Sequence, residues 1–97
     1  MTLKWHPSLT AEKWAAYPLE ARVAMVQNEI SRARNSRAAG YYGGTRLALE
    51  RALELLDLTV ETSVRDPSLR KLLRWRERIA RAYLLPWEEI PEALLEP

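Results

Sequence analysis

Four carboxylates recur along one stretch of the sequence at the spacing of a helix. Glu50, Glu54, Asp57 and Glu61 are separated by four, three and four residues, so a helix places them along one side. Carboxylates in a row could hold a divalent cation, but a dimetal site of this kind also needs Glu-x-x-His pairs on facing helices, and the sequence contains no such pair. We therefore interpret this row as a solvated face, or as one paired with arginines of a neighbouring helix.

Other residue types with catalytic or cofactor chemistry are scarce. The single histidine, His6, precedes Pro7 and has no recognisable partner for general-base catalysis, and there is no cysteine for a thiolate nucleophile or metal site. The glycines all lie in the run Gly40–Gly44, which lacks the phosphate-binding patterns Gly-x-x-x-x-Gly-Lys-Ser/Thr and Gly-x-Gly-x-x-Gly. We expect no catalytic residue, no metal site and no cofactor, and hence a non-enzymatic protein.

Positive charge gathers on the third long helix that the sequence predicts. Between Arg65 and Arg81 there are seven cations against two acids, whereas the charged residues after Leu85 are all acidic. Arginines along a helix neutralise phosphates, and tryptophan stacks on unpaired bases. The residues that could contact nucleic acid in this way are Arg70, Arg74, Trp75, Arg78 and Arg81. Because the net charge is only +2 and the acidic tail could fold over the same face, nucleic-acid binding is the alternative function.

Arg76 interrupts the apolar stripe of the same helix, seven residues after Leu69 and three before Ile79. The expected apolar face of this helix consists of Leu69, Leu72, Leu73, Ile79, Ala80, Tyr83 and Leu84. A buried guanidinium is costly unless its donors are satisfied, so we predict a buried ion pair with Glu29, or with another acid where two helices meet. Three alternatives stay open: a head group that turns outward to solvent, a carboxylate of a second copy, and a bound anion.

The stretch from Thr45 to Ser63 has a broad apolar arc and predicts a helix at the centre of the fold. Its polar side is interrupted by Leu47 and Leu58, which are eleven residues, about three turns, apart. We predict that these two leucines form the interface of a homodimer or bind a protein partner. The alternative is cover by the ends of the same chain, through Trp5, Leu9 and Trp14 or through Trp87, Ile90, Leu94 and Leu95.

The helix signals predict a single domain, residues 1–97, with an all-α fold. We expect a small three-helix bundle packed up-down-up, with short extra helical segments at the N- and C-termini. The expected helices span about 10–17, 18–39, 45–64 and 67–85, followed by a short helical tail at 86–97. Thr10 and Asp66 are the expected N-caps, and Gly40 is the expected left-handed C-cap.

The composition is that of an ordinary globular domain. Hydrophobic residues make up 47% of the 97, and no apolar run approaches the ~20 residues of a membrane span. The first ten residues lack the long apolar stretch of a secretory signal, so we expect a cytoplasmic protein without a membrane segment. The leading hypothesis is a small interaction module that self-associates or binds a protein partner through helix faces, and the alternative is an accessory nucleic-acid-binding protein.

Overall fold

The computed structural model describes residues 3–95, apart from the side chain of Trp87. Predictions for residues 96 and 97, and for Trp87 as a docking side chain, lie outside this description. The helices are α1 (Ala11–Ala15), α2 (Leu19–Ala38), α3 (Tyr42–Glu61) and α4 (Leu69–Leu84), followed by the short 3₁₀ helices η1 (Trp87–Glu89) and η2 (Glu92–Leu95). Residues 3–95 contain no strand, and the predicted all-α fold is confirmed.

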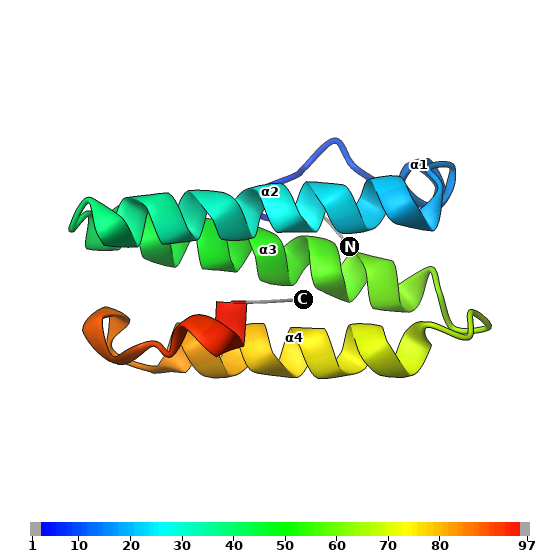
Figure 1. Ribbon diagram of the computed structural model, residues 1–97. Coiled ribbons are helices and arrows are strands. Elements are labelled where there is room, and N and C mark those ends of the chain that lie inside the picture. The colour runs from blue at the N-terminus through cyan, green and yellow to red at the C-terminus, as the bar shows by residue number, and fades with distance from the viewer. Residues whose placement is uncertain (1–2, 96–97) are drawn as a thin grey trace.

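The three long helices run side by side in the order α2, α3, α4, with successive helices antiparallel (Figure 1). Helix α3 packs extensively on α2 and on α4, whereas α2 and α4 make no comparable contact with each other within the described residues. The bundle is therefore closer to a layer than to a closed triangle. The prediction that the 45–63 stretch is central is confirmed, because this helix is the one that both neighbours share.

The two ends of the chain cover opposite faces of this layer (Figure 1). The N-terminal segment, residues 3–10, crosses α3 and is held there by Glu54, and α1 packs on the same helix. The C-terminal segment turns back so that η2 packs on α4. Glu92 of η2 pairs with two arginines of α2, Arg34 at 2.8 Å and Arg37 at 3.6 Å. The end segments thus complete a core that three helices in a layer leave open.

Two of the three expected helix caps have the predicted role. Thr10 Oγ1 accepts a hydrogen bond from the backbone N of Lys13 at 3.1 Å, as an N-cap does. Gly40 has a φ of 74°, and the N–H of Tyr41 bonds to the carbonyl of Ser36 at 2.8 Å, which is the bond pattern of a left-handed C-cap. Asp66 caps the turn before α4, since its Oδ1 accepts from the backbone N of Ser68 at 2.8 Å, and the regular helix begins only at residue 69.

Helix α3 begins three residues earlier than predicted, at Tyr42, so Gly43 and Gly44 belong to its first turn. Gly44 lies where α3 starts against α2. A Cβ atom at this position would lie 2.6 Å from the ring of Tyr41 and 2.8 Å from Ser36 Oγ. The absence of a side chain at Gly44 therefore permits this close approach, whereas Gly40 provides the left-handed turn before the helix.

The core face of α4 differs from the predicted one. Its buried residues are Leu72, Trp75, Ile79 and Ala82, whereas Leu73 and Leu84 of the expected apolar face are 46% and 81% exposed. The buried arc is turned by about a quarter of the circumference from the predicted arc. The physical reason is the area of Trp75, which is only 3% exposed, together with the small Ala82 on the same side.

No helix of the described chain has the length and apolar composition that a membrane span requires.

Candidate functional site

Helix α4 lies at the edge of the layer and presents a second apolar stripe to solvent. We define the α4 stripe as Leu69, Leu73, Ala80 and Leu84, which lie on one flank of the helix because they are spaced four, seven and four residues apart. Leu73 and Leu84 are strongly exposed, and Leu69 and Ala80 are partly buried. Isolated exposed leucines are common, but an aligned row along an edge helix is a feature of interaction surfaces. The sequence predicted an exposed apolar stripe on α3, at Leu47 and Leu58, whereas the structure has its exposed stripe on α4.

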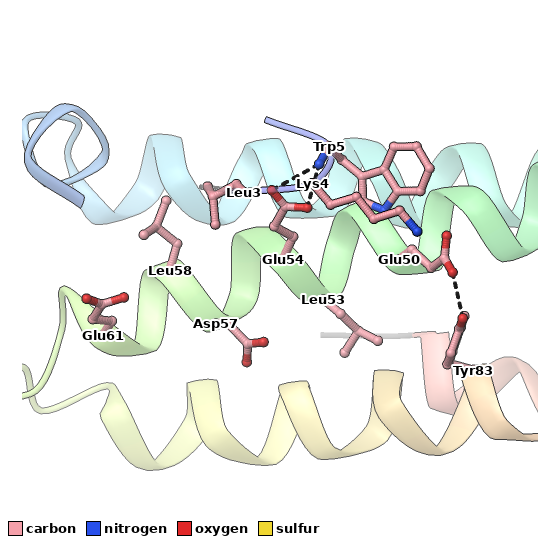
Figure 2. A pocket seen from close by; sticks show the side chains of 10 residues that line it. All are labelled: Leu3, Lys4, Trp5, Glu50, Leu53, Glu54, Asp57, Leu58, Glu61 and Tyr83. Atoms are coloured by element: carbon pink, nitrogen blue, oxygen red, sulfur yellow. Dashed lines mark hydrogen bonds between the residues drawn. The ribbon is translucent and has the colours of Figure 1, made fainter. Parts of the chain in front are cut away.

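An acidic edge lies beside this stripe, on α3. We define the acidic edge as Glu50, Asp57 and Glu61, which line an open groove of about 390 Å³ together with Leu53, Leu58 and residues 3–5 (Figure 2). Glu50 Oε1 accepts a hydrogen bond from the hydroxyl of Tyr83 at 2.6 Å. This bond is the largest cause of a raised pKa for Tyr83, to which burial also contributes. Glu61 is exposed and has no ion-pair partner among residues 3–95.

Arg76 pairs with Asp57 of α3, and the predicted buried pair with Glu29 is wrong. Helix α3 lies between Arg76 on α4 and Glu29 on α2, and Glu29 accepts from Arg32 of its own helix at 3.0 Å. The Arg76 side chain is 42% exposed, so the head group turns outward at the seam between two helices. The hydrogen bond to Asp57, and then its charge, raise the pKa of Arg76.

A basic edge lies on the other side of the α4 stripe. We define it as Arg70, Arg74 and Arg81, all of them exposed. Arg70 and Arg74 have no ion-pair partner in the described part of the chain, and Arg81 lies 3.4 Å from Glu77. Arg78 is partly buried. Among the described acids of the C-terminal segment, Glu92 pairs with arginines of α2 and not with this edge.

Trp75 cannot serve the nucleic-acid contact proposed for it from the sequence. It is 3% exposed and belongs to the core between the helices, where its indole Nε1 has no hydrogen-bond acceptor among residues 3–95. A stacking platform needs an open ring face, which a core tryptophan lacks. The prediction that Trp75 stacks on a base is therefore wrong, and only the arginines of that hypothesis remain on the surface.

Leu47 and Leu58 do not form the exposed pair that the sequence predicted. Leu58 is 5% exposed and shares a pocket with Leu3 of the N-terminal segment, so the same chain covers it (Figure 2). Leu47 is partly buried beside Arg32 and Ser36 of α2. The prediction of an interface at Leu58 is wrong, and cover by the N-terminal segment, the alternative, is what the structure has.

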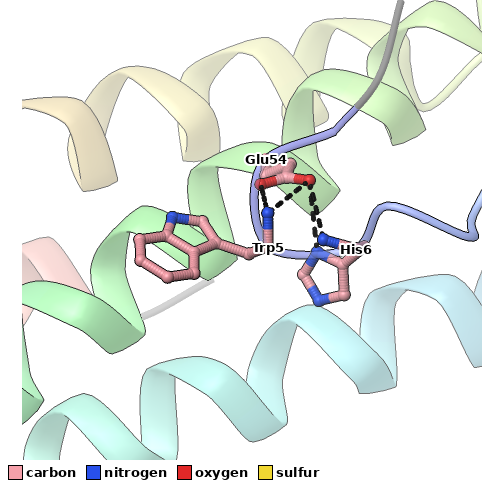
Figure 3. Close-up of polar contacts among 3 residues, drawn as sticks. All are labelled: Trp5, His6 and Glu54. Atoms are coloured by element: carbon pink, nitrogen blue, oxygen red, sulfur yellow. Dashed lines mark hydrogen bonds and ion pairs between the residues drawn. The ribbon is translucent and has the colours of Figure 1, made fainter.

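His6 has a partner that the sequence did not reveal. Its Nδ1 lies 3.5 Å from Glu54 Oε1, and the same oxygen accepts the backbone N–H of His6 at 3.1 Å (Figure 3). The two residues are 48 positions apart, so no local pattern could have identified the pair. Within residues 3–95, no three His, Cys, Asp or Glu side chains come together as metal ligands would.

Arg22 is a second polar residue whose burial the sequence analysis missed. It is 8% exposed, and its Nη1 donates to Thr62 Oγ1 at 2.8 Å and to Ser63 Oγ at 3.4 Å, near the C-terminus of α3. A cation is favoured at that end of a helix, where the last carbonyls carry partial negative charge. The available signal was spacing, because Arg22 lies four residues before the buried Val26.

These observations define the class of the protein as a small helical bundle with an exposed apolar stripe between two edges of opposite charge. Comparison with known proteins adds no relative: no family, no curated protein and no solved structure matches this chain.

Proposed function

We propose that the protein is a small, non-enzymatic interaction module that self-associates through the α4 stripe. The observation that carries this proposal is the exposure of Leu73 and Leu84, at 46% and 81%, on one flank of a helix that has already buried another face in the core. Burying two such side chains against a second molecule removes apolar surface from water at about 25 cal/mol per Å². Helical proteins most often bury a surplus stripe in a two-fold dimer.

The charges on the two sides of the stripe favour a second copy as the partner. The acidic edge and the basic edge lie on opposite sides of the same apolar row, so one molecule carries both halves of a complementary surface. In a dimer whose two-fold axis runs along α4, the helices are parallel and each basic edge meets the acidic edge of the other copy. An antiparallel arrangement brings like charges together, which is repulsive.

The register of α3 and α4 identifies which charges meet. Asp57 of α3 pairs with Arg76 of α4. Glu50 lies seven residues before Asp57, and its partner Tyr83 lies seven residues after Arg76. The same register places Glu61 level with Leu72, midway along the helix between Arg70 and Arg74. In the parallel dimer, Glu61 of one copy therefore faces the Arg70 and Arg74 end of the other copy.

A charge-reversal mixture tests this arrangement. The first variant carries Arg70→Glu with Arg74→Glu. Its self-association should be about tenfold weaker at low salt, because both symmetric contacts of the variant homodimer lose their attraction. A second variant, Glu61→Arg, should weaken it as well. Mixing the two variants should restore a heterodimer, since each contact then joins opposite charges. The matched control is Glu20→Arg, an exposed acid of α2 that should have no effect on association.

Nucleic-acid binding is the second candidate, supported by Arg70 and Arg74, which are exposed and have no ion-pair partner among residues 3–95. An arginine row without an accessible tryptophan binds phosphates in a salt-dependent, sequence-independent way. Submicromolar binding of DNA or RNA at physiological salt, abolished by the Arg70 and Arg74 reversal, would replace the self-association proposal.

A cytoplasmic location is part of the self-association proposal and is supported by the lack of cysteine.

A further inference from the structure

A groove of about 280 Å³ lies between α2 and α3, beside the point where the N-terminal segment crosses α3. Its described lining consists of Arg32, Asn35 and Ser36 of α2 and of Gly44, Leu47, Ala48 and Arg51 of α3. Two of these residues are arginines and none is an acid. The groove is separate from the α4 stripe and from both charged edges, so its role is independent of the proposed self-association.

An exposed aromatic ring lies at the end of the groove where α3 begins. A Cβ atom at Gly44 would lie 2.6 Å from Cδ1 of Tyr41, and one at Gly43 would lie 3.7 Å from Cε2 of the same ring. The ring therefore lies across both glycines, and one of them, Gly44, lines the groove. Because Tyr41 is nevertheless 66% exposed, the side of the ring that faces away from the glycines is open to solvent. An open aromatic face is where an unpaired base stacks.

Positive charge gathers at the other end of the groove, around Trp5. Cζ of Arg51 lies 5.8 Å from the centroid of the Trp5 ring, and Nζ of Lys4 lies 4.8 Å from it (Figure 2). Neither cation forms an ion pair with residues 3–95. Arg32 uses Nη1 for the buried Glu29 and is 63% exposed, so its other N–H groups stay accessible. Arg51 and Lys4 thus supply the net charge, and Arg32 adds donors.

Two acids of α3 lie near these cations, and both are engaged elsewhere. Glu54 is held by the backbone N–H groups of Trp5 and His6, and its side chain is only 10% exposed. Glu50 accepts a hydrogen bond from the hydroxyl of Tyr83, on the side of α4. Neither acid lines the groove, so the charged groups that reach it are cations.

The geometry points to a single-stranded nucleic acid as the ligand of this groove, with a base stacked on Tyr41 and phosphates bound by Arg51 and Lys4. Gly44 and Arg51 are seven residues, about 10.5 Å, apart along the helix. At about 3.4 Å per stacked nucleotide, this distance corresponds to about three nucleotides. An acidic peptide matches the cations but has no base for the exposed ring. This surface is distinct from the α4 arginines that carry the second candidate function.

The test is a titration of a fluorescent thymidine strand of about twelve nucleotides with the full chain, followed by anisotropy at low salt. We expect a Kd of about 100 µM or tighter. An abasic strand of the same length keeps the phosphates, and polyglutamate keeps only negative charge, so each should bind about tenfold more weakly. This comparison needs no variant. No binding up to about 1 mM chain, or equal affinity for the abasic strand or for polyglutamate, would overturn the inference.

Variants then locate the two contacts. Tyr41→Ala should weaken binding of the thymidine strand about tenfold, whereas Tyr41→Phe, which keeps the ring, should bind like the native chain. Arg51→Gln should reduce the slope of log Kd against log salt by about 0.7, the loss of one phosphate contact.

Control variants test whether the strand binds elsewhere. Tyr17→Ala removes another exposed tyrosine, at the far end of α2, and should leave binding unchanged. Arg70→Gln with Arg74→Gln should change the Kd less than about twofold, because these arginines lie on α4. Binding that survives Tyr41→Ala but is lost in the Arg70 and Arg74 variant would overturn the inference and place the nucleic acid on α4.

Discussion

Trp5 donates its backbone N–H to both carboxylate oxygens of Glu54, at 3.2 Å and 2.9 Å. The backbone N–H of His6 reaches the same carboxylate at 3.1 Å. One side chain in the middle of α3 therefore fixes the course of the N-terminal segment. The consequence is that Leu58, on the same helix, is covered by its own chain.

Removing this carboxylate should release the N-terminal segment. We expect Glu54→Ala to lower the free energy of unfolding by about 1–3 kcal/mol, because two backbone donors lose a charged acceptor. The amide hydrogens of Trp5 and His6 should exchange faster with solvent, measured by NMR. Gln27→Ala, at an exposed position of α2 outside the proposed dimer surface, is the control and should change stability by less than about 0.5 kcal/mol. Unchanged exchange at Trp5 in Glu54→Ala would show that Glu54 does not hold the segment.

Arg22 and Thr62 should be energetically coupled. In the native chain, Thr62→Val takes away the shorter of the two hydrogen bonds of the buried guanidinium, with an expected cost of about 1–2 kcal/mol beyond the loss of the hydroxyl itself. In an Arg22→Met background that extra cost should vanish, since no guanidinium is left to satisfy. Chemical denaturation of the four proteins of this double-mutant cycle gives the coupling energy. A coupling indistinguishable from zero would mean that the contact does not stabilise the fold.

Tyr83 should ionise above the ordinary tyrosine pKa. The bond to Glu50 favours the protonated phenol, so the pKa of Tyr83 is raised in the folded chain. The hydrogen bond of the protonated Tyr83 contributes stability below about pH 10, the pKa of tyrosine in the unfolded chain. This contribution is lost as pH rises through the higher pKa of Tyr83 in the folded chain, because the unfolded chain gives up the proton first. Stability should therefore fall less steeply in this alkaline range for Tyr83→Phe than for the native chain.

Ultraviolet absorbance measures this ionisation directly. The titration of the native chain minus that of Tyr83→Phe should have its midpoint above the ordinary value, and Glu50→Gln should move the midpoint down. A midpoint at the ordinary value in the native chain would contradict the raised pKa.

The sequence predicted the features that depend on local periodicity. The broad apolar arc of α3, the cap at Thr10 and the left-handed turn at Gly40 follow from residues within a few positions of each other, and all are present. The face of α4 could not be predicted in this way. Two overlapping apolar arcs exist on this helix, and the choice between them depends on where the large ring of Trp75 packs, which is a tertiary effect.

The polar pairs were beyond sequence reasoning for a different reason. Glu54 meets Trp5 across 49 positions, and Arg22 meets Thr62 across 40. Pairing with arginines of a neighbouring helix was one of two interpretations of the acidic row, beside a solvated face. Asp57 does pair in this way, but the identity of its arginine depends on the register of α3 against α4. Glu29 was matched to the wrong arginine because α3 separates the two helices that carry them.

The mass of the chain in solution tests the central proposal most directly. Light scattering at about 100 µM should give about twice the 11.2 kDa of one chain, and Leu73→Glu with Leu84→Glu should return it to the single-chain mass with helical circular dichroism unchanged. Val64→Glu, a change at another exposed apolar residue outside the stripe, should leave the dimer intact. A native chain that keeps the single-chain mass up to about 1 mM, where association is weaker than about 4 kcal/mol, would contradict self-association through α4.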